Sequence, residues 1–355
     1  MTVNGGEPTS GSVLLNSDGV YSISYSATDL AGNTVSHTAS VKIDRVGPSV
    51  TMSVTPPVNS RGWHTAPVTV SASGADAGSG FTVCDAPVLL DQDGVNYSVS
   101  LSCTDVAGNV AFAQVTGIDI DTTFPVTSVT LAGPAGENGW FTGAVTVTLS
   151  AADPTSGILT TDYRIVGSVS QPYTGPFTVS AQGANVVEFF SRNGAGMLEA
   201  AKAVSVNIDS VAPNVIALLQ PGVNVGGETW YASPPSVTLA ATDAASGVPV
   251  DGVSFRINGG AAATYPGSLS ITSDGVNTLE FWARDRAGNE HRPAPIAVRV
   301  DTLPPVTNAF VISGTQGQPG WYRSQVLLAL NATDAGTGVA PGATMFRVNG
   351  SPPQQ

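Results

Sequence analysis

Hydrophobic residues alternate with small polar residues in short stretches along the whole chain. This alternation predicts β-strands that bury one face, and no segment keeps the period of a helix over a dozen residues. The clearest alternating stretches are residues 68–71, 145–149, 237–240 and 326–330. Each one follows a pair of residues that begins with Trp, and each precedes a loop that runs from Asp to Gly. The stretches therefore predict the same strand in successive copies of one unit.

A second phrase recurs in the same register. It consists of an Asp-x-Ala-Gly-Asn turn, a strand that ends in Asp, and a linker that ends in Pro. Its copies run from Asp29 to Pro48, from Asp105 to Pro125 and from Asp285 to Pro305, with a divergent copy from Asn193 to Pro213. Recurrence at this spacing predicts a tandem array. The predicted regions are 1–47, the second half of a repeat, then the whole repeats 48–124, 125–212 and 213–304, and finally 305–355, the first half of a repeat.

Each whole repeat is predicted to contain six or seven short strands, with turn residues between them. This number of strands, with a turn signal about every 8–12 residues, indicates an immunoglobulin-like β-sandwich. The predicted fold class is therefore all-β, with tandem immunoglobulin-like β-sandwiches. Because the linkers are only about four residues long and end in Pro, the array is predicted to form an elongated, semi-stiff rod.

The composition argues against several classes of function. The net charge is −13 and the only Lys residues are Lys42 and Lys202, so the chain lacks the basic surface that binds nucleic acid. No apolar run approaches ~18 residues, which predicts no membrane span. His37, His64 and His291 lie at unrelated positions of different repeats, and no catalytic motif accompanies them. We therefore expect no enzyme activity.

Two whole repeats carry motifs that resemble a known group. These motifs include Gly139-Trp-Phe-Thr, Val145-Thr-Val-Thr-Leu149, Tyr173-Thr-Gly-Pro-Phe177, Asn258-Gly-Gly260 and Asp285-Arg-Ala-Gly-Asn289. They resemble the bacterial immunoglobulin-like tandem repeats of large surface and adhesin-type proteins. The resemblance implies a non-catalytic, extracellular or cell-surface structural protein that acts as a stalk, spacer or filament subunit. The alternative is an adhesin, or a carbohydrate-binding module array attached to a secreted enzyme, with a surface glycan or protein receptor as its partner.

Acidic residues recur at the positions where successive sandwiches should meet. The end of the last strand of one repeat should approach two loops of the next repeat, the loop after its second strand and its last hairpin turn. The groups predicted to meet are Asp44 with Asp76, Asp105 and Asn109, then Asp121 with Asp153 and Asn193, then Asp209 with Asp243, Asp285 and Asn289, and finally Asp301 with Asp334.

Clustered oxygen ligands of this kind suit Ca²⁺. The resemblance supports calcium as the cofactor, because some bacterial adhesin repeats bind it at such joints, and no other cofactor is expected. The alternative is that these Asp and Asn residues only form turns, which requires no metal.

Cysteine and tryptophan give two further predictions. Cys84 and Cys103 fall on adjacent predicted strands of one sheet, where a disulfide would fit an oxidising compartment. The alternative is that both are small buried residues. Trp residues occupy one position in every repeat, which favours a structural plug at the end of the sandwich over a platform for sugar stacking. These structural aromatic residues are Trp63, Trp140, Trp230 and Trp321.

The first and last regions have the same phase, since Val3-Asn-Gly-Gly6 corresponds to Val348-Asn-Gly350. One interpretation is a segment cut from a longer array. The other is head-to-tail completion, in which strands of neighbouring copies pair and Asp29 and Asn33 of one copy approach Asp301 of the next. Half a sandwich exposes strand edges and a core face, which would bind a partner. The predicted partners are therefore neighbouring copies or adjoining repeats.

Overall fold

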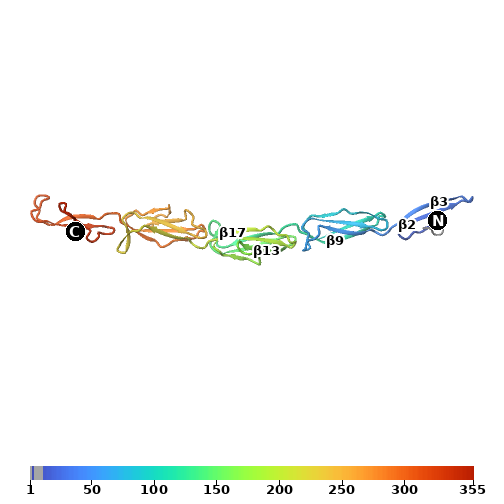
Figure 1. Ribbon diagram of the computed structural model, residues 1–355, viewed down its shortest axis with the longest axis horizontal. Coiled ribbons are helices and arrows are strands. Elements are labelled where there is room, and N and C mark those ends of the chain that lie inside the picture. Colours follow the sequence, from blue (N-terminus) through green and yellow to red (C-terminus); the bar gives the residue numbers. More distant parts are fainter. Residues whose placement is uncertain (1, 4–10) are drawn as a thin grey trace. The chain divides into compact units, whose positions relative to one another are not determined.

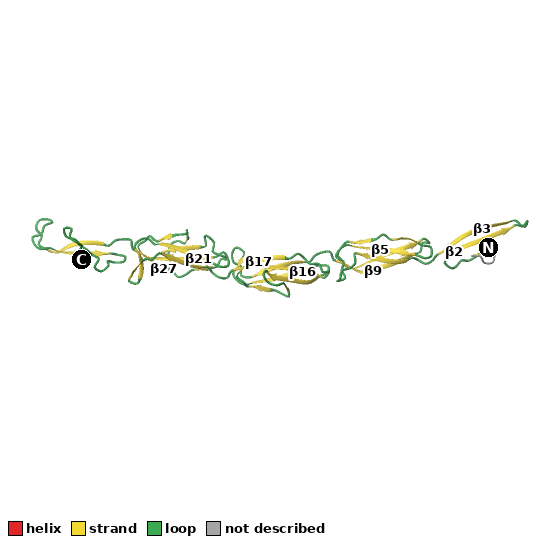
Figure 2. Ribbon diagram, viewed as in Figure 1, coloured by secondary structure: helices red, strands yellow, loops and turns green. Residues whose placement is uncertain are grey.

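The computed structural model describes residues 2–3 and 11–355, so the motif residues Asn4–Gly6 lie outside the described part of the chain. Figure 2 shows strands joined by loops, and the described residues contain no helix. The chain forms two compact units, and both include parts of residues 125–212. Unit 1 comprises Met1–Val129, Leu149–Gly175 and Glu188–Ala203, and unit 2 comprises Thr130–Thr148, Pro176–Val187 and Val204–Gln355.

Residues 1–47 contribute one sheet in the order β1-β2-β3. Its strands are β1 (Thr2–Val3), β2 (Gly19–Thr28) and β3 (Thr34–Ile43). β2 and β3 lie side by side in Figure 1 and form an antiparallel hairpin, with Thr28 opposite Thr34 at its tip. The turn at that tip is closed by Asp29, whose Oδ1 accepts the N–H groups of Ala31 (2.9 Å) and Asn33 (2.8 Å).

Residues 48–124 form two sheets, in the orders β4-β5-β7 and β6-β8-β9. The strands are β4 (Ser49–Thr55), β5 (Val68–Ala75), β6 (Phe81–Cys84), β7 (Val88–Leu90), β8 (Gly94–Asp105) and β9 (Val110–Ile120). The first, second and fourth strands thus separate from the third, fifth and sixth, which is the division found in an immunoglobulin-like sandwich. Buried residues of both sheets form one core: Val68, Val70, Val99, Leu101, Ile118 and Ile120.

Residues 125–212 contain sheets in the orders β10-β12-β15 and β11-β17-β16-β13-β14. The strands are β10 (Val126–Ala132), β11 (Trp140–Phe141), β12 (Val145–Ala152), β13 (Ile158–Ile165), β14 (Gln171–Pro172), β15 (Phe177–Val179), β16 (Gly183–Asn193) and β17 (Lys202–Ile208). β11 runs parallel to β17, with Phe141 opposite Ile208. This short parallel pairing is important for the joint described below.

Residues 213–304 form the sheets β18-β21-β24 and β19-β20-β27-β25-β22-β23, with β26 paired to β25. The strands are β18 (Asn214–Leu219), β19 (Val223–Val225), β20 (Glu228–Tyr231), β21 (Ser236–Thr242), β22 (Val253–Ile257), β23 (Ala263–Thr264), β24 (Leu269–Ser270), β25 (Gly275–Arg284), β26 (Glu290–His291) and β27 (Ile296–Val300). Val237 and Leu239 of one sheet pack in one buried cluster with Leu279, Phe281 and Val298 of the other.

Residues 305–355 contribute one antiparallel hairpin of β28 (Val306–Ser313) and β29 (Leu327–Thr333). Every sheet takes its strands from a single predicted region. The Asn-Gly turn predicted after β22 is also present, because Asn258 and Gly259 both have positive φ angles, of 51° and 70°. The all-β, tandem-sandwich fold class is therefore confirmed.

Candidate functional site

The joint that follows β3 brings three carboxylates together. Asp44, Asp76 and Asp105 each offer one oxygen, and these oxygens all lie within 4.8 Å of one another. Asp44 comes directly after β3, Asp76 directly after β5, and Asp105 ends β8. The three positions therefore come from the end of one repeat and from two loops of the next, as the sequence predicts.

The loop after β5 is shaped to receive Asp44. Oδ1 of Asp76 accepts the N–H groups of Gly78 (3.0 Å) and Gly80 (2.8 Å), which folds the loop. Oδ2 of Asp44 then accepts the N–H of Ser79 at 2.5 Å. A Cβ at Gly78 would lie 2.6 Å from that carboxylate, so a side chain there would displace Asp44. The pKa of Asp44 is lowered, first by the Ser79 hydroxyl and then by its N–H.

Asp105 is held by the turn that it begins. Its Oδ1 accepts the N–H of Asn109 (2.8 Å), and its Oδ2 accepts Nδ2 of the same residue (2.7 Å). Nδ2 of Asn109 also donates to the carbonyl of Asp44 (3.1 Å), so this amide links the two repeats through the backbone. Burial raises the pKa of Asp105, but the hydrogen bonds from Asn109 outweigh it, and the net pKa lies below the usual value.

The joint that follows β17 repeats this arrangement. Oxygens of Asp209, Asp243 and Asp285 lie within 4.8 Å of one another, and Asp209 and Asp285 are buried. Oδ2 of Asp209 accepts the N–H of Ser246 (3.0 Å). Nδ2 of Asn289 donates to Oδ2 of Asp285 (2.8 Å) and to the carbonyl of Asp209 (3.0 Å). The same set of groups therefore recurs two joints further along, in unit 2.

The joint that follows β9 differs, since its third position is Asn193. Nδ2 of this amide donates to Oδ2 of Asp121 (2.9 Å), to Oδ2 of Asp153 (3.1 Å) and to the carbonyl of Thr123 (3.0 Å). The residues predicted to meet do meet, but the centre of this joint holds an amide group between two carboxylates.

The joint that follows β27 contains two of the predicted residues. Oδ2 of Asp301 accepts the N–H of Thr337 (2.7 Å), and Oδ1 of Asp334 accepts the N–H groups of Gly336 (3.0 Å) and Gly338 (2.9 Å). The pKa of Asp301 is lowered, first by the Thr337 hydroxyl and then by its N–H. The first two of the three joint positions are thus present here.

The residue after each Trp holds the joint aspartate in place. The N–H of Asp121 donates to the carbonyl of His64 (2.9 Å), that of Asp209 to Phe141 (2.8 Å) and that of Asp301 to Tyr231 (2.9 Å). His64 and Tyr231 are buried, whereas Trp63, Trp140 and Trp230 are half-buried. The deeper position therefore belongs to the second residue in two of these pairs, while Trp140 and Phe141 are both half-buried, and the plug role of these three Trp residues stays a prediction. Trp321 is 75% exposed in residues 305–355, and its plug role likewise stays a prediction.

The two cysteines and Trp282 also have partners in the structure. Cys84 and Cys103 face each other across β6 and β8, and their sulfur atoms are bonded. Trp282 is half-buried, and the guanidinium carbon of Arg292 lies 4.0 Å from its ring centroid, so one face of the ring is covered. Among the described residues, no helix is long and apolar enough to cross a membrane.

Sequence reasoning missed a buried polar cluster in unit 1 that contains Glu199. Glu199 accepts hydrogen bonds from the hydroxyl and N–H of Thr127, from the N–H of Ser191 (2.9 Å) and from Nζ of Lys202 (3.0 Å). Thr127 and Ser191 are themselves buried. By position within the repeat, they correspond to the apolar Val215 and Ala283. That double replacement is the only signal by which the sequence could have indicated the cluster.

Comparisons with solved structures find distant likenesses. A tetra-tandem repeat from the extending region of a large adhesion protein is 17% identical, over 81% of this chain and 82% of that chain, with a TM-score of 0.30. A 1.5-MDa bacterial ice-binding adhesin is 15% identical, over 73% and 99%, with a TM-score of 0.28. Fibronectin(III)-like modules of Clostridium thermocellum CbhA are 14% identical, over 49% and 93%, with a TM-score of 0.24. No protein-family model and no curated protein matches the chain.

Proposed function

We propose that this protein is a non-catalytic structural array on a bacterial surface, and that it serves as a stalk or spacer. The observation that supports this most is the joint, which the chain builds repeatedly from the end of one repeat and two loops of the next. A repeated joint links neighbours in series, which is what a load-bearing extension requires. By contrast, His37, His64 and His291 are far apart in sequence and belong to different regions, which gives no support for catalysis.

Calcium at the joints is the second part of this proposal. The donor set fits the ion, because Ca²⁺ takes six to eight oxygen ligands and readily uses carboxylates and backbone carbonyls. Asp44, Asp76 and Asp105 present three carboxylate oxygens within 4.8 Å of one another, and their negative charges repel unless a cation lies between them. The joint of Asp209, Asp243 and Asp285 offers the same set. Bound Ca²⁺ would neutralise these charges and couple the adjoining repeats.

Small-angle X-ray scattering and thermal melting of the full chain, with Ca²⁺ and with a chelator, test this proposal together. We expect Ca²⁺ to raise the melting temperature. In scattering, we expect Ca²⁺ to increase the average length of the chain and to reduce the spread of lengths. A chain with the same melting curve and the same scattering in both conditions would refute calcium coupling. A compact chain in both conditions would refute the stalk.

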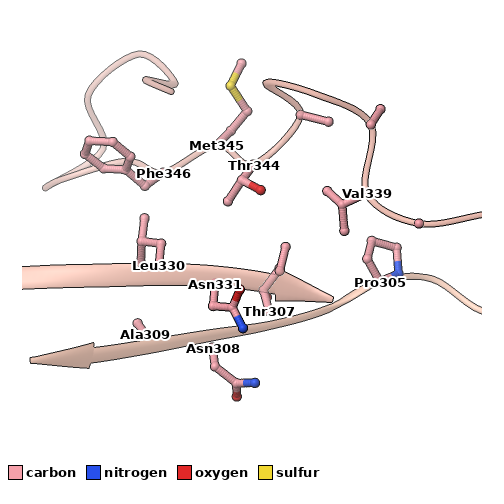
Figure 3. A pocket seen from close by; sticks show the side chains of 14 residues that line it. Pro305, Thr307, Asn308, Ala309, Leu330, Asn331, Val339, Thr344, Met345 and Phe346 are labelled. Carbon is pink, nitrogen blue, oxygen red and sulfur yellow. The ribbon is translucent and has the colours of Figure 1, made fainter. Parts of the chain in front are cut away.

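Head-to-tail pairing between copies is favoured by one specific observation. The inward face of the β28–β29 hairpin is exposed, with Val311 at 40% and Leu328 at 54%. By position in the repeat, Leu328 corresponds to Val237, which is fully buried in its complete sandwich. Figure 3 shows Leu330 of this hairpin below Met345 and Phe346, which line one cavity with it. The face carries the apolar residues of a core without its second sheet.

The occupant that fits this face is the β2–β3 hairpin of a second copy. β2 corresponds to β25 and β3 to β27, which supply the second sheet in residues 213–304. Tyr25 is 44% and Val41 37% exposed, whereas their counterparts Phe281 and Val298 are buried. Pairing the two hairpins would bury both faces and complete one sandwich.

Light scattering across a range of concentrations tests the pairing. We expect the mass of the chain to rise with concentration, and Leu328→Asp to prevent the rise. Asn308→Asp is the matched control, because Asn308 lies on β28 next to the inward-facing Ala309 and so on the opposite face. A chain that stays monomeric at high concentration, or a rise that both variants prevent equally, would contradict the pairing.

A further inference from the structure

Asn193 keeps the turn of the joint but changes the group at its centre. Its Oδ1 accepts the N–H of Met197 at 2.8 Å, as Oδ1 of Asp105 accepts the N–H of Asn109 at 2.8 Å. The second side-chain atom differs, because Asn193 has Nδ2 at the position where Asp105 has Oδ2. Asn and Asp have nearly the same shape, so the backbone is preserved while an acceptor becomes a donor.

Nδ2 of Asn193 satisfies the two carboxylates that remain. It lies 2.9 Å from Oδ2 of Asp121 and 3.1 Å from Oδ2 of Asp153, and its third acceptor is the carbonyl of Thr123 at 3.0 Å. Asp121 and Asn193 are both buried. Hydrogen bonds from an amide to ionised carboxylates are stronger than neutral ones, and burial strengthens them further. The two negative charges therefore already have a shared partner from the protein itself.

The amide is used differently at the other two joints. Asn109 and Asn289 lie four residues later in the turn, and each donates to one carboxylate, that of Asp105 or Asp285. Their other acceptors are backbone carbonyls, those of Asp44 and Val46 for Asn109 and that of Asp209 for Asn289. Met197 occupies this later position in the divergent turn. The amide of this turn is therefore at its first residue, in the centre of the joint, and not at its last residue.

We propose that the joint at Asp121 is held closed by Asn193 without a cation, and that calcium dependence is confined to the joints at Asp44 and Asp209. This inference rests on the calcium function proposed above. A cation at the Asp121 joint would face N–H hydrogens, would find two carboxylates in place of three, and would have to displace hydrogen bonds that are already made. A second contact, from Nδ2 of Asn59 to the carbonyl of Ala195 (2.8 Å), also joins these two repeats, but Nδ2 of Asn138 makes the corresponding bond to the carbonyl of Arg286 (2.9 Å) at the Asp209 joint, so Asn193 alone distinguishes the two joints.

The consequence is a chain whose joints respond unequally to calcium. When calcium is removed, repeats 48–124 and 125–212 stay coupled. The coupling of residues 1–47 to 48–124, and of 125–212 to 213–304, weakens.

The test counts ions bound by the full chain in equilibrium dialysis against Ca²⁺ alone, using two isosteric variants. Asp243→Asn removes one carboxylate from the joint at Asp209, and Asp153→Asn removes one from the joint at Asp121. Both residues fold their own loops through Oδ1, which Asn retains. We expect Asp243→Asn to lower the count by one ion and Asp153→Asn to leave it unchanged. A loss of one ion with Asp153→Asn would overturn the inference.

Hydrogen exchange gives a second readout that needs no variant. With chelator, we expect the turn at 285–289 to exchange at least tenfold faster, and the turn at 193–197 to exchange at an unchanged rate. An equal acceleration at both turns would contradict the inference but leave the calcium function intact. If the chain binds no ions and exchange changes at no turn, the calcium function itself is refuted. The proposed contrast between the joints is then refuted as well.

Discussion

Replacing Glu199 tests how far a single buried carboxylate supports the repeat that contains it. Glu199 is 7% exposed and accepts hydrogen bonds from two backbone N–H groups, one hydroxyl and one ammonium. Glu199→Ala leaves the N–H groups of Thr127 and Ser191 buried without that acceptor. Each such loss costs about 1–3 kcal/mol, and breaking a buried charged network costs about 3–5 kcal/mol. The side chain of Lys202 is 41% exposed, so the ion pair itself adds little.

We therefore expect Glu199→Ala to destabilise the structure around β10 and β16 by about 3–5 kcal/mol. Hydrogen exchange measured by mass spectrometry is the suitable assay, because it resolves individual repeats where a melting curve of the whole array does not. Exchange of the protected amides in these strands should accelerate by about 10²- to 4 × 10³-fold, since each 1.4 kcal/mol is a factor of ten.

Glu188→Ala is the matched control, because Glu188 lies on β16, the strand that contains Ser191. Glu188 forms a surface ion pair with Arg164, whose side chain is 50% exposed. Removing such a pair costs about 0–1 kcal/mol, so exchange should accelerate by about fivefold or less. If Glu199→Ala and Glu188→Ala accelerate exchange equally, the buried network contributes nothing beyond a surface pair, and the reasoning is wrong.

Three further predictions concern the disulfide, the core and the joint. Replacing Cys84 and Cys103 by Ser should lower the free energy of unfolding of residues 48–124 by about 3 kcal/mol, because the bond closes a loop with a sequence separation of 19. Denaturation with and without reductant measures the contribution of the bond. Leu279→Ala should lower the free energy of unfolding by about 2–5 kcal/mol, because Leu279 is fully buried. Leu328→Ala in the monomeric chain should lower it by under about 1 kcal/mol. Urea denaturation measures both losses, and equal losses would refute the assigned core. The hydrogen bonds that lower the pKa of Asp44 and Asp105 contribute stability that is complete above the unfolded pKa of about 3.9 and is lost as pH falls through the lowered values. The hydrogen-exchange protection factors at 105–109, which correct for the intrinsic pH dependence of amide exchange, should therefore be constant from pH 7 to 5 and fall in stronger acid.

The strands and their order could be predicted because the information is local. Alternation decides which face of a strand is apolar, and Asn-Gly or Asp-x-Ala-Gly-Asn specifies the turn that ends it. Each sheet stays inside one predicted region because a sandwich of this size can bury its own core. The meeting of Asp44, Asp76 and Asp105 could also be predicted, since chain order and sandwich topology place these loops at one end of the repeat.

The chemistry of each joint was decided only by the tertiary structure. The sequence identifies Asn193 as a departure from the turn motif, but its bonds to Asp121 and Asp153 span 72 and 40 residues and depend on which atom of the amide points inward. Glu199 and Thr127 are likewise 72 residues apart, and neither is one of the recurring Asp, Ala, Gly, Asn or Pro residues that define the repeated phrase.

The aromatic pair shows the same division between local and tertiary information. Its recurrence is visible in the sequence, and the larger residue, Trp, is the one predicted to have the structural role. The structure shows that the residue after Trp carries the backbone bond to the joint aspartate, because that residue pairs with the end of the last strand. Periodicity and turns follow from neighbouring residues in the sequence, whereas a hydrogen bond depends on atoms that folding alone brings within 3 Å.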